Sequence, residues 1–123
     1  MSPFAVRSLF EALKDGLYDY MINERGDVGS WIRIACIRGL TSFIEILFSH
    51  ADGIPDFEAY LPPGLYHEAI GGILKQGVER LDGVRQEAGE HFLRLLLIPL
   101  PTVATAKLWQ IQGDLLMREL FLA

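Results

Sequence analysis

The segment from residue 28 to residue 50 has the longest continuous apolar pattern in the chain. Its apolar positions recur nearly all round a helix, rather than along one stripe. They are Trp31, Ile32, Ile34, Ala35, Ile37, Leu40, Phe43, Ile44, Leu47 and Phe48. A helix of this kind is buried on more than one side. The segment therefore predicts a packing of several helices, with neighbours on both of its flanks.

The same periodicity predicts further helices before and after this segment. Ser2-Pro3 is a helix start, because serine is a favoured N-cap and proline suits the first helical position. The other helices are predicted at residues 3–18, from residue 64 onward, at 83–98 and at 102–122. In the first of them the apolar residues are Phe4, Val6, Leu9, Phe10, Leu13 and Leu17. The connectors are predicted at residues 19–29 and 51–64, and the second ends in a pair of prolines that stops any helix.

Half of the residues are hydrophobic, and the mean hydropathy of +0.25 is high for a free-standing domain of 123 residues. A membrane-spanning helix needs roughly 18 nearly uncharged residues. The best apolar run, residues 95–100, is interrupted by Pro99. We therefore expect no membrane span, and expect instead a fragment of a larger body that buries its faces against neighbours.

Charge and cysteine content exclude further classes of protein. The net charge is −5, so the chain lacks the cationic surface that non-specific nucleic-acid binding needs. Its single cysteine, Cys36, rules out an internal disulfide framework and fits a small core residue in a reducing, cytosolic setting. No secretory signal is visible at the start of the sequence.

An internal repeat relates the second and fourth predicted helices. Ile32-Arg33-x-x-Cys36 aligns with Val84-Arg85-x-x-Ala88, 52 residues later. The matching positions beyond these are Asp27 with Asp82, Leu40 with Phe92, and Ile44 with Leu96. An aspartate followed by aliphatic-Arg-x-x-small resembles the second helix of HEAT repeats. The arginine is expected to bridge to the preceding or following turn, and the spacing exceeds the typical ~40–47 residues because the connectors are long.

These patterns predict an all-α fold, a fragment of a HEAT/armadillo-type α-solenoid with about five helices in antiparallel pairs. Residues 1–123 form one fragment of about two and a half repeats, at 3–50, 64–98 and 102–122. Because at least about three repeats are needed for stability, a larger parent solenoid is expected.

The loop before the second helix offers several chemical interpretations. Arg25-Gly26-Asp27 matches an integrin tripeptide, which is a coincidence in a chain without secretory features. Gly26, Gly29 and Ser30 could bind an anion at a helix N-terminus, but the loop lacks the lysine of a phosphate loop and follows no strand. Trp31 fits either the core or a clamp on the loop. We expect a structural loop, with glycines in turns and Asp27 as the helix cap.

Metal and catalytic motifs are absent from the sequence. His67-Glu68 begins like a zinc-peptidase helix, but position 71 is glycine where the second histidine must lie. The three histidines have no cysteine partners at ligand spacing, and no serine has a histidine at a suggestive spacing. We therefore expect no cofactor, no metal and no enzyme active site.

A family resemblance is carried by Asp19-Tyr20 and by Arg25-Gly26-Asp27-Val28-Gly29-Ser30-Trp31-Ile32-Arg33. These residues resemble the C-terminal domain of the tubulin-folding cofactor D family, which has an Asp-Tyr, a short spacer and Arg-Gly-Asp-Val-Gly-Ser-x-Val-Arg entering a helix. Ile32 stands where the family usually has valine. The segment 79–89 resembles the following repeat more loosely. The resemblance extends over residues 9–97 and fades after Pro99, where the family usually has a long connector.

The resemblance implies a large solenoid that chaperones tubulin in the cytoplasm, associated with the cytoskeleton. Such a cofactor captures β-tubulin, and works with tubulin cofactors E and C and an Arf-like small GTPase. It assembles or takes apart the αβ heterodimer, and contributes to GTP hydrolysis by tubulin only within the assembled complex. The candidate partner-contact or structural loop is Arg25, Gly26, Asp27, Gly29, Ser30 and Trp31, and the repeat signature is Arg33, Asp82 and Arg85.

Two alternatives to a tubulin cofactor remain open. The first is a generic HEAT-repeat adaptor between proteins, with no tubulin role. The loop from Arg25 to Ser30 discriminates against it, because a generic HEAT turn does not need Gly-Asp-Val-Gly. The second is a small enzyme that uses the same loop to hold a phosphate.

Overall fold

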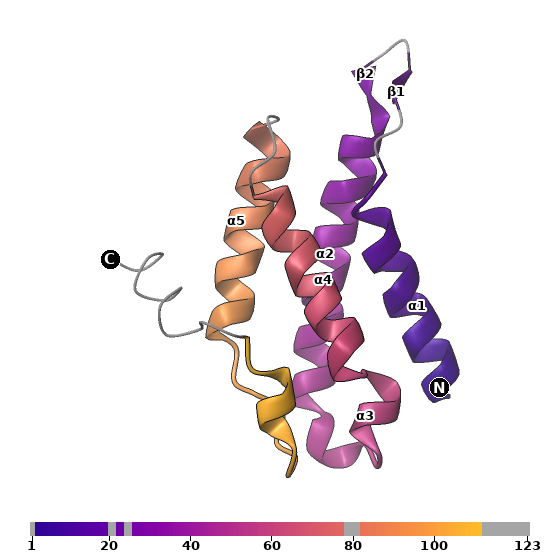
Figure 1. Ribbon diagram of the computed structural model, residues 1–123, viewed down its shortest axis with the longest axis vertical. Helices are drawn as coiled ribbons and strands as arrows, with labels where there is room; N and C mark the ends of the chain where they lie inside the picture. The colour runs from indigo at the N-terminus through magenta and orange to yellow at the C-terminus, as the bar shows by residue number, and fades with distance from the viewer. Residues whose placement is uncertain (1, 20–21, 24–25, 78–81, 112–123) are drawn as a thin grey trace.

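The computed structural model describes residues 2–19, 22–23, 26–77 and 82–111; at 22–23, 26–28 and 82 it describes the backbone alone. Four long helices dominate the described part, and Figure 1 shows them running alternately up and down the molecule. They are α1 (Pro3–Gly16), α2 (Val28–Ser49), α4 (Pro63–Gln76) and α5 (Asp82–Leu97). The short elements are β1 (Ile22–Asn23), β2 (Gly26–Asp27), η1 (Ala51–Gly53), α3 (Phe57–Tyr60) and η2 (Ala106–Trp109). The predicted all-helical fold is confirmed, with a short antiparallel hairpin of two two-residue strands added between α1 and α2.

The helices pack as two neighbouring pairs. Helix α1 packs on α2, α4 packs on α5, and the most extensive contact joins α2 to α5 across the pairs. The hairpin lies at one end of the molecule, whereas α3 and η2 lie at the other (Figure 1). Arrangement in stacked pairs is what an α-solenoid fragment requires.

The start of α1 shows how local sequence fixes a helix. The Ser2 hydroxyl accepts a hydrogen bond from the backbone N–H of Ala5 at 3.2 Å, and Pro3 occupies the first turn. Both features were predicted. Helix α1 buries fewer of its apolar side chains than the sequence pattern indicated. Phe4 is 72% exposed and Leu9 is 46% exposed.

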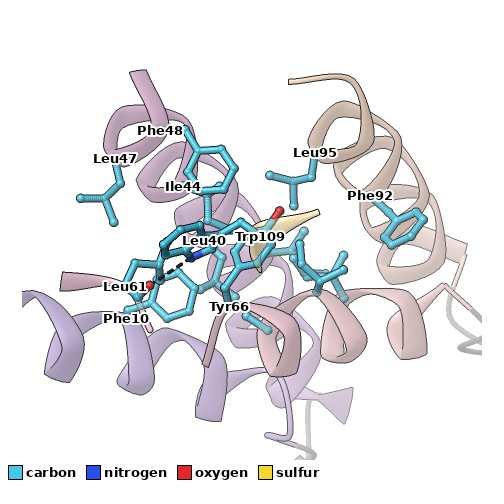
Figure 2. Close-up of a cluster of buried hydrophobic side chains, with 14 of the residues drawn as sticks. Phe10, Leu40, Ile44, Leu47, Phe48, Leu61, Tyr66, Phe92, Leu95 and Trp109 are labelled. Carbon is cyan, nitrogen blue, oxygen red and sulfur yellow. Dashed lines mark hydrogen bonds between the residues drawn. The ribbon is translucent and has the colours of Figure 1, made fainter. Parts of the chain in front are cut away.

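One continuous hydrophobic core fills the space between the four long helices. Figure 2 shows a part of this core, where side chains from α1, α2, α4, α5 and η2 converge. Trp109 is fully buried there, 5.0 Å from the Phe57 ring between centroids, and its indole N–H donates to the Leu61 carbonyl at 3.0 Å. The labelled members of the core are Phe10, Leu40, Ile44, Leu47, Phe48, Leu61, Tyr66, Phe92, Leu95 and Trp109.

Two predictions about the connectors and the end of the chain were incomplete. The connector at residues 51–64 contains η1 and α3, each too short for a helical period to appear in the sequence. The fifth helix predicted at 102–122 is not formed over 102–111, where the chain makes turns and the short η2. Anchoring of Trp109 on Leu61 fixes this compact path. Residues 112–122 of that prediction lie outside the described residues.

Candidate interaction surface

The described part of the candidate loop lies between α1 and α2, at one end of the molecule. Gly26 and Asp27 make up β2, which pairs with β1 so that Ile22 faces Asp27 and Asn23 faces Gly26. Helix α2 begins directly afterwards, at Val28, with Gly29 buried and Ser30 half-buried. Arg25 and the side chain of Asp27 lie outside the described residues, so the capping role of Asp27 stays a prediction.

Trp31 is 67% exposed in the first turn of α2, and Ile32 beside it is 36% exposed. The core position considered for Trp31 was therefore wrong. Arg33, Ile37 and Leu40 take the inward positions of this helix, which turns the indole away from the packed side. Exposed tryptophans are enriched among the residues that anchor protein interfaces. We call the β1–β2 hairpin together with Trp31 and Ile32 the hairpin surface.

The side chain of Arg33 links α2, next to the hairpin surface, to the segment that follows α1. Its side chain is buried, at 1% exposure, and Nη1 donates to the backbone carbonyl of Asp19 at 2.6 Å. This contact is the bridge to a preceding turn that the repeat signature predicted. It holds the chain that leaves α1 against the first turns of α2. The contact is part-buried, and a charge-assisted hydrogen bond is stronger than a neutral one.

Helix α4 holds the same end of α1 from the other side. The Gln76 amide donates to the Leu17 carbonyl at 3.0 Å. Gly72 permits the close approach, because a Cβ at that position would lie 2.8 Å from a Leu17 methyl carbon and 3.3 Å from the Tyr18 hydroxyl. Gln76 was not among the residues predicted from the sequence, although a polar residue inside an apolar helical pattern was the available signal. Together with Arg33, these contacts give the hairpin surface a rigid base.

Cys36 lies at the crossing of α1 and α2 and carries no chemistry. A Cβ on Gly16 would overlap its sulfur, so the two helices approach closely there. Burial raises the pKa of the Cys36 thiol, and the Asp19 carboxylate adds to that effect. The thiol is therefore held in its protonated form, which is neither a nucleophile nor a metal ligand.

The second copy of the repeat signature is placed differently. Arg85 is exposed whereas Arg33 is buried, and Val84 is buried at 1% exposure whereas Ile32 is at the surface. Asp82 is the first residue of α5, and its side chain lies outside the described residues. The later positions of the two signatures are buried in both helices. These are Cys36 with Ala88, Leu40 with Phe92, and Ile44 with Leu96.

A polar network crosses the contact between α2 and α5. Thr41 Oγ1 lies 2.9 Å from His91 Nδ1, and His91 Nε2 lies 3.2 Å from Glu87 Oε2. Arg38 binds both carboxylate oxygens of Glu87. The first three are connected like the nucleophile, base and acid of a hydrolase. Thr41 is completely buried, however, so no substrate can reach its hydroxyl and the network joins helices instead.

No group of three or more histidine, cysteine, aspartate or glutamate side chains is arranged to hold a metal ion within the part of the chain that the structure describes. In the same described ranges, no helix combines the length and the apolar character needed to cross a bilayer.

Paired helices around one shared core, with an exposed tryptophan on a braced end, define a helical scaffold of the α-solenoid class. Residues 67–122, a little under half of the chain, match the family model described as tubulin folding cofactor D C terminal. The match supports a C-terminal fragment of that family and confirms the resemblance predicted from the sequence. No solved structure matches the chain.

The matched segment differs from the one that the sequence analysis favoured. It begins in α4 and continues past η2, so the expectation that the resemblance fades after Pro99 was wrong. The segment from Arg25 to Arg33 lies outside the matched residues. Its likeness to the family therefore rests on its own sequence, and its role stays a prediction.

Proposed function

We propose that this chain is a scaffold segment of a tubulin-folding cofactor that binds β-tubulin in the cytoplasm. In this role it takes part in assembly and disassembly of the αβ heterodimer, together with cofactors E and C and an Arf-like small GTPase. Its contribution to GTP hydrolysis is made within that complex, by positioning tubulin and not by an active site of its own. The observation that carries the proposal is the family match over residues 67–122.

The hairpin surface is the part of the described structure best suited to contact a folded partner. Its tryptophan is two-thirds exposed, and the surface is braced by the contacts of Arg33 and Gln76 with the end of α1. A rigid base lowers the entropy lost when a partner binds. A protein partner also suits the net charge of −5, which disfavours nucleic acid.

Co-purification from cells tests the tubulin role. The tagged protein is captured at physiological salt, and eluates are probed for β-tubulin and for Arf-like small GTPases. We expect β-tubulin to be recovered well above the level seen with an unrelated helical protein of similar charge. Recovery of neither β-tubulin nor the GTPase would favour a helical adaptor without a tubulin role.

A further inference from the structure

The hydroxyl of Thr41 has a single hydrogen and lies close to both a carbonyl oxygen and an imidazole nitrogen. It lies 2.8 Å from the carbonyl of Ile37, one turn earlier in α2, and 2.9 Å from Nδ1 of His91 on α5. Thr41 is fully buried, and the side chain of His91 is only 13% exposed. Water therefore cannot readily replace either partner, and the hydrogen must be directed to one of them.

Glu87 fixes the other nitrogen of the imidazole. The hydrogen bond from Arg38 holds the pKa of Glu87 below its ordinary value, which keeps the carboxylate ionised. An ionised carboxylate only accepts hydrogen bonds. Because its Oε2 lies 3.2 Å from His91 Nε2, the carboxylate favours a hydrogen on that nitrogen whether the ring is neutral or charged.

We propose that Thr41 and His91 form a two-state hydrogen-bond switch across the α2–α5 contact, set by protonation of His91. When the ring is neutral, Nδ1 is an acceptor and Thr41 donates to it. When the ring is charged, Nδ1 is a donor, Thr41 accepts from it, and the hydroxyl hydrogen turns to the Ile37 carbonyl. A threonine hydroxyl that donates to the carbonyl four residues earlier often bends a helix. Protonation of His91 thus changes the hydrogen bonding of α2 at the point where the two helix pairs meet.

The charged groups around this switch are few. From α5 these are Glu87, Glu90 and Arg94, and from α2 they are Arg38 and Glu45. Arg94 pairs with Glu45 at 2.7 Å, and Arg38 pairs with Glu87. The charged side chains and the histidine of α4 are engaged elsewhere. Lys75 lies over the Tyr18 ring, Glu68 pairs with Lys14, and His67 contacts the Leu108 carbonyl. Within the described residues, Glu87 is therefore the group that holds Nε2.

Nitrogen NMR of the wild-type chain tests the switch without any substitution. Ring-labelled His91 is followed from acid to alkaline pH, and each nitrogen reports whether it carries a hydrogen. The expected result is hydrogen on both nitrogens at low pH, and the Nε2–H tautomer alone at high pH. A neutral ring with its hydrogen on Nδ1 would overturn the proposal, because Thr41 would then accept in both states.

A pair of variants measures how strongly Thr41 affects proton binding by His91. In Thr41→Val the charged ring loses an acceptor and the neutral ring loses a donor. Hydrogen bonds made by charged groups are the stronger, so His91 should bind its proton about fivefold more weakly. Thr41→Ser keeps the hydroxyl and should match the wild type within about twofold. Equal proton binding by His91 in both variants would contradict the switch. If Thr41→Val does not fold, the tautomer of His91 in the wild-type chain decides whether the switch exists.

Discussion

Helices α2 and α5 carry the same sequence signature but bury different parts of it. In α2 the arginine of the signature is buried and the aliphatic residue before it is at the surface, whereas in α5 the order is reversed. Arg33 can be buried because the Asp19 carbonyl, in the segment that follows α1, accepts its hydrogen bond. The signature therefore specifies a close helix packing, while the neighbouring chain decides whether its arginine becomes structural.

The difference between the two arginines gives the largest predicted effect. Arg33→Ala should lower the free energy of unfolding by about 3 kcal/mol, because it removes a buried side chain together with its hydrogen bond to the Asp19 carbonyl. Arg85→Ala, at an exposed position, should change it by at most about 0.5 kcal/mol. Urea unfolding at neutral pH measures both. Equal losses of unfolding free energy in the two variants would mean that the two arginines contribute equally to stability.

Replacing a glycine by alanine should change the stability of the protein in opposite directions in the two helix pairs. Gly16→Ala places a methyl group on the Cys36 sulfur and should destabilise the protein by about 1–3 kcal/mol. Gly89→Ala, in α5, meets no atom within 4 Å and should stabilise it by about 0.5–1 kcal/mol. Thermal unfolding monitored by circular dichroism reports both changes.

The Gly16 prediction has an internal control. Adding Cys36→Ala to Gly16→Ala should recover part of the loss, because the second change removes the sulfur that the new methyl group meets. No recovery in the double variant would show that the close crossing of α1 and α2 is not the cause.

The contact between α2 and α5 should weaken in acid. The pKa of Glu87 is lowered first by its hydrogen bond from Arg38, so its contribution to stability is complete above the unfolded value of 4.5. That contribution is lost as pH falls through the lower folded-state pKa. Glu87→Gln should therefore cost at most about 1 kcal/mol at neutral pH, and its difference from wild type should narrow below pH 4.5. A pH-independent difference would contradict this cause.

The sequence predicted the four long helices and their boundaries well, but it missed the short elements. The boundaries of α1, α2, α4 and α5 follow from periodicity, from the cap at Ser2 and from the paired prolines. Helix α3 was missed because four residues cannot show a helical period. The segment before Trp109 looked helical because its apolar spacing is helical, but a tertiary contact with Leu61 determines its path.

The candidate site was only partly accessible from sequence. The role of the loop between residues 25 and 31 stays a prediction; Gly26 and Asp27, which belong to it, form β2 at one end of the molecule. The outward direction of Trp31 could not be predicted, because nearly every position of α2 is apolar and the pattern has no polar face to orient it. The support from Gln76 depends on a contact 59 residues away in the chain.

The most direct test of a tubulin contact at the hairpin surface is to compare the affinity of Trp31→Ala and Phe4→Ala variants for αβ-tubulin. Trp31 and Phe4 are both exposed aromatic residues, but Trp31 belongs to the hairpin surface and Phe4 lies at the opposite end of α1. Loss of an interface anchor typically costs about 2 kcal/mol or more. We therefore predict that Trp31→Ala weakens the affinity for tubulin about 30-fold, whereas Phe4→Ala changes it less than about twofold. Equal affinities of the two variants and the wild type would contradict a tubulin contact at the hairpin surface.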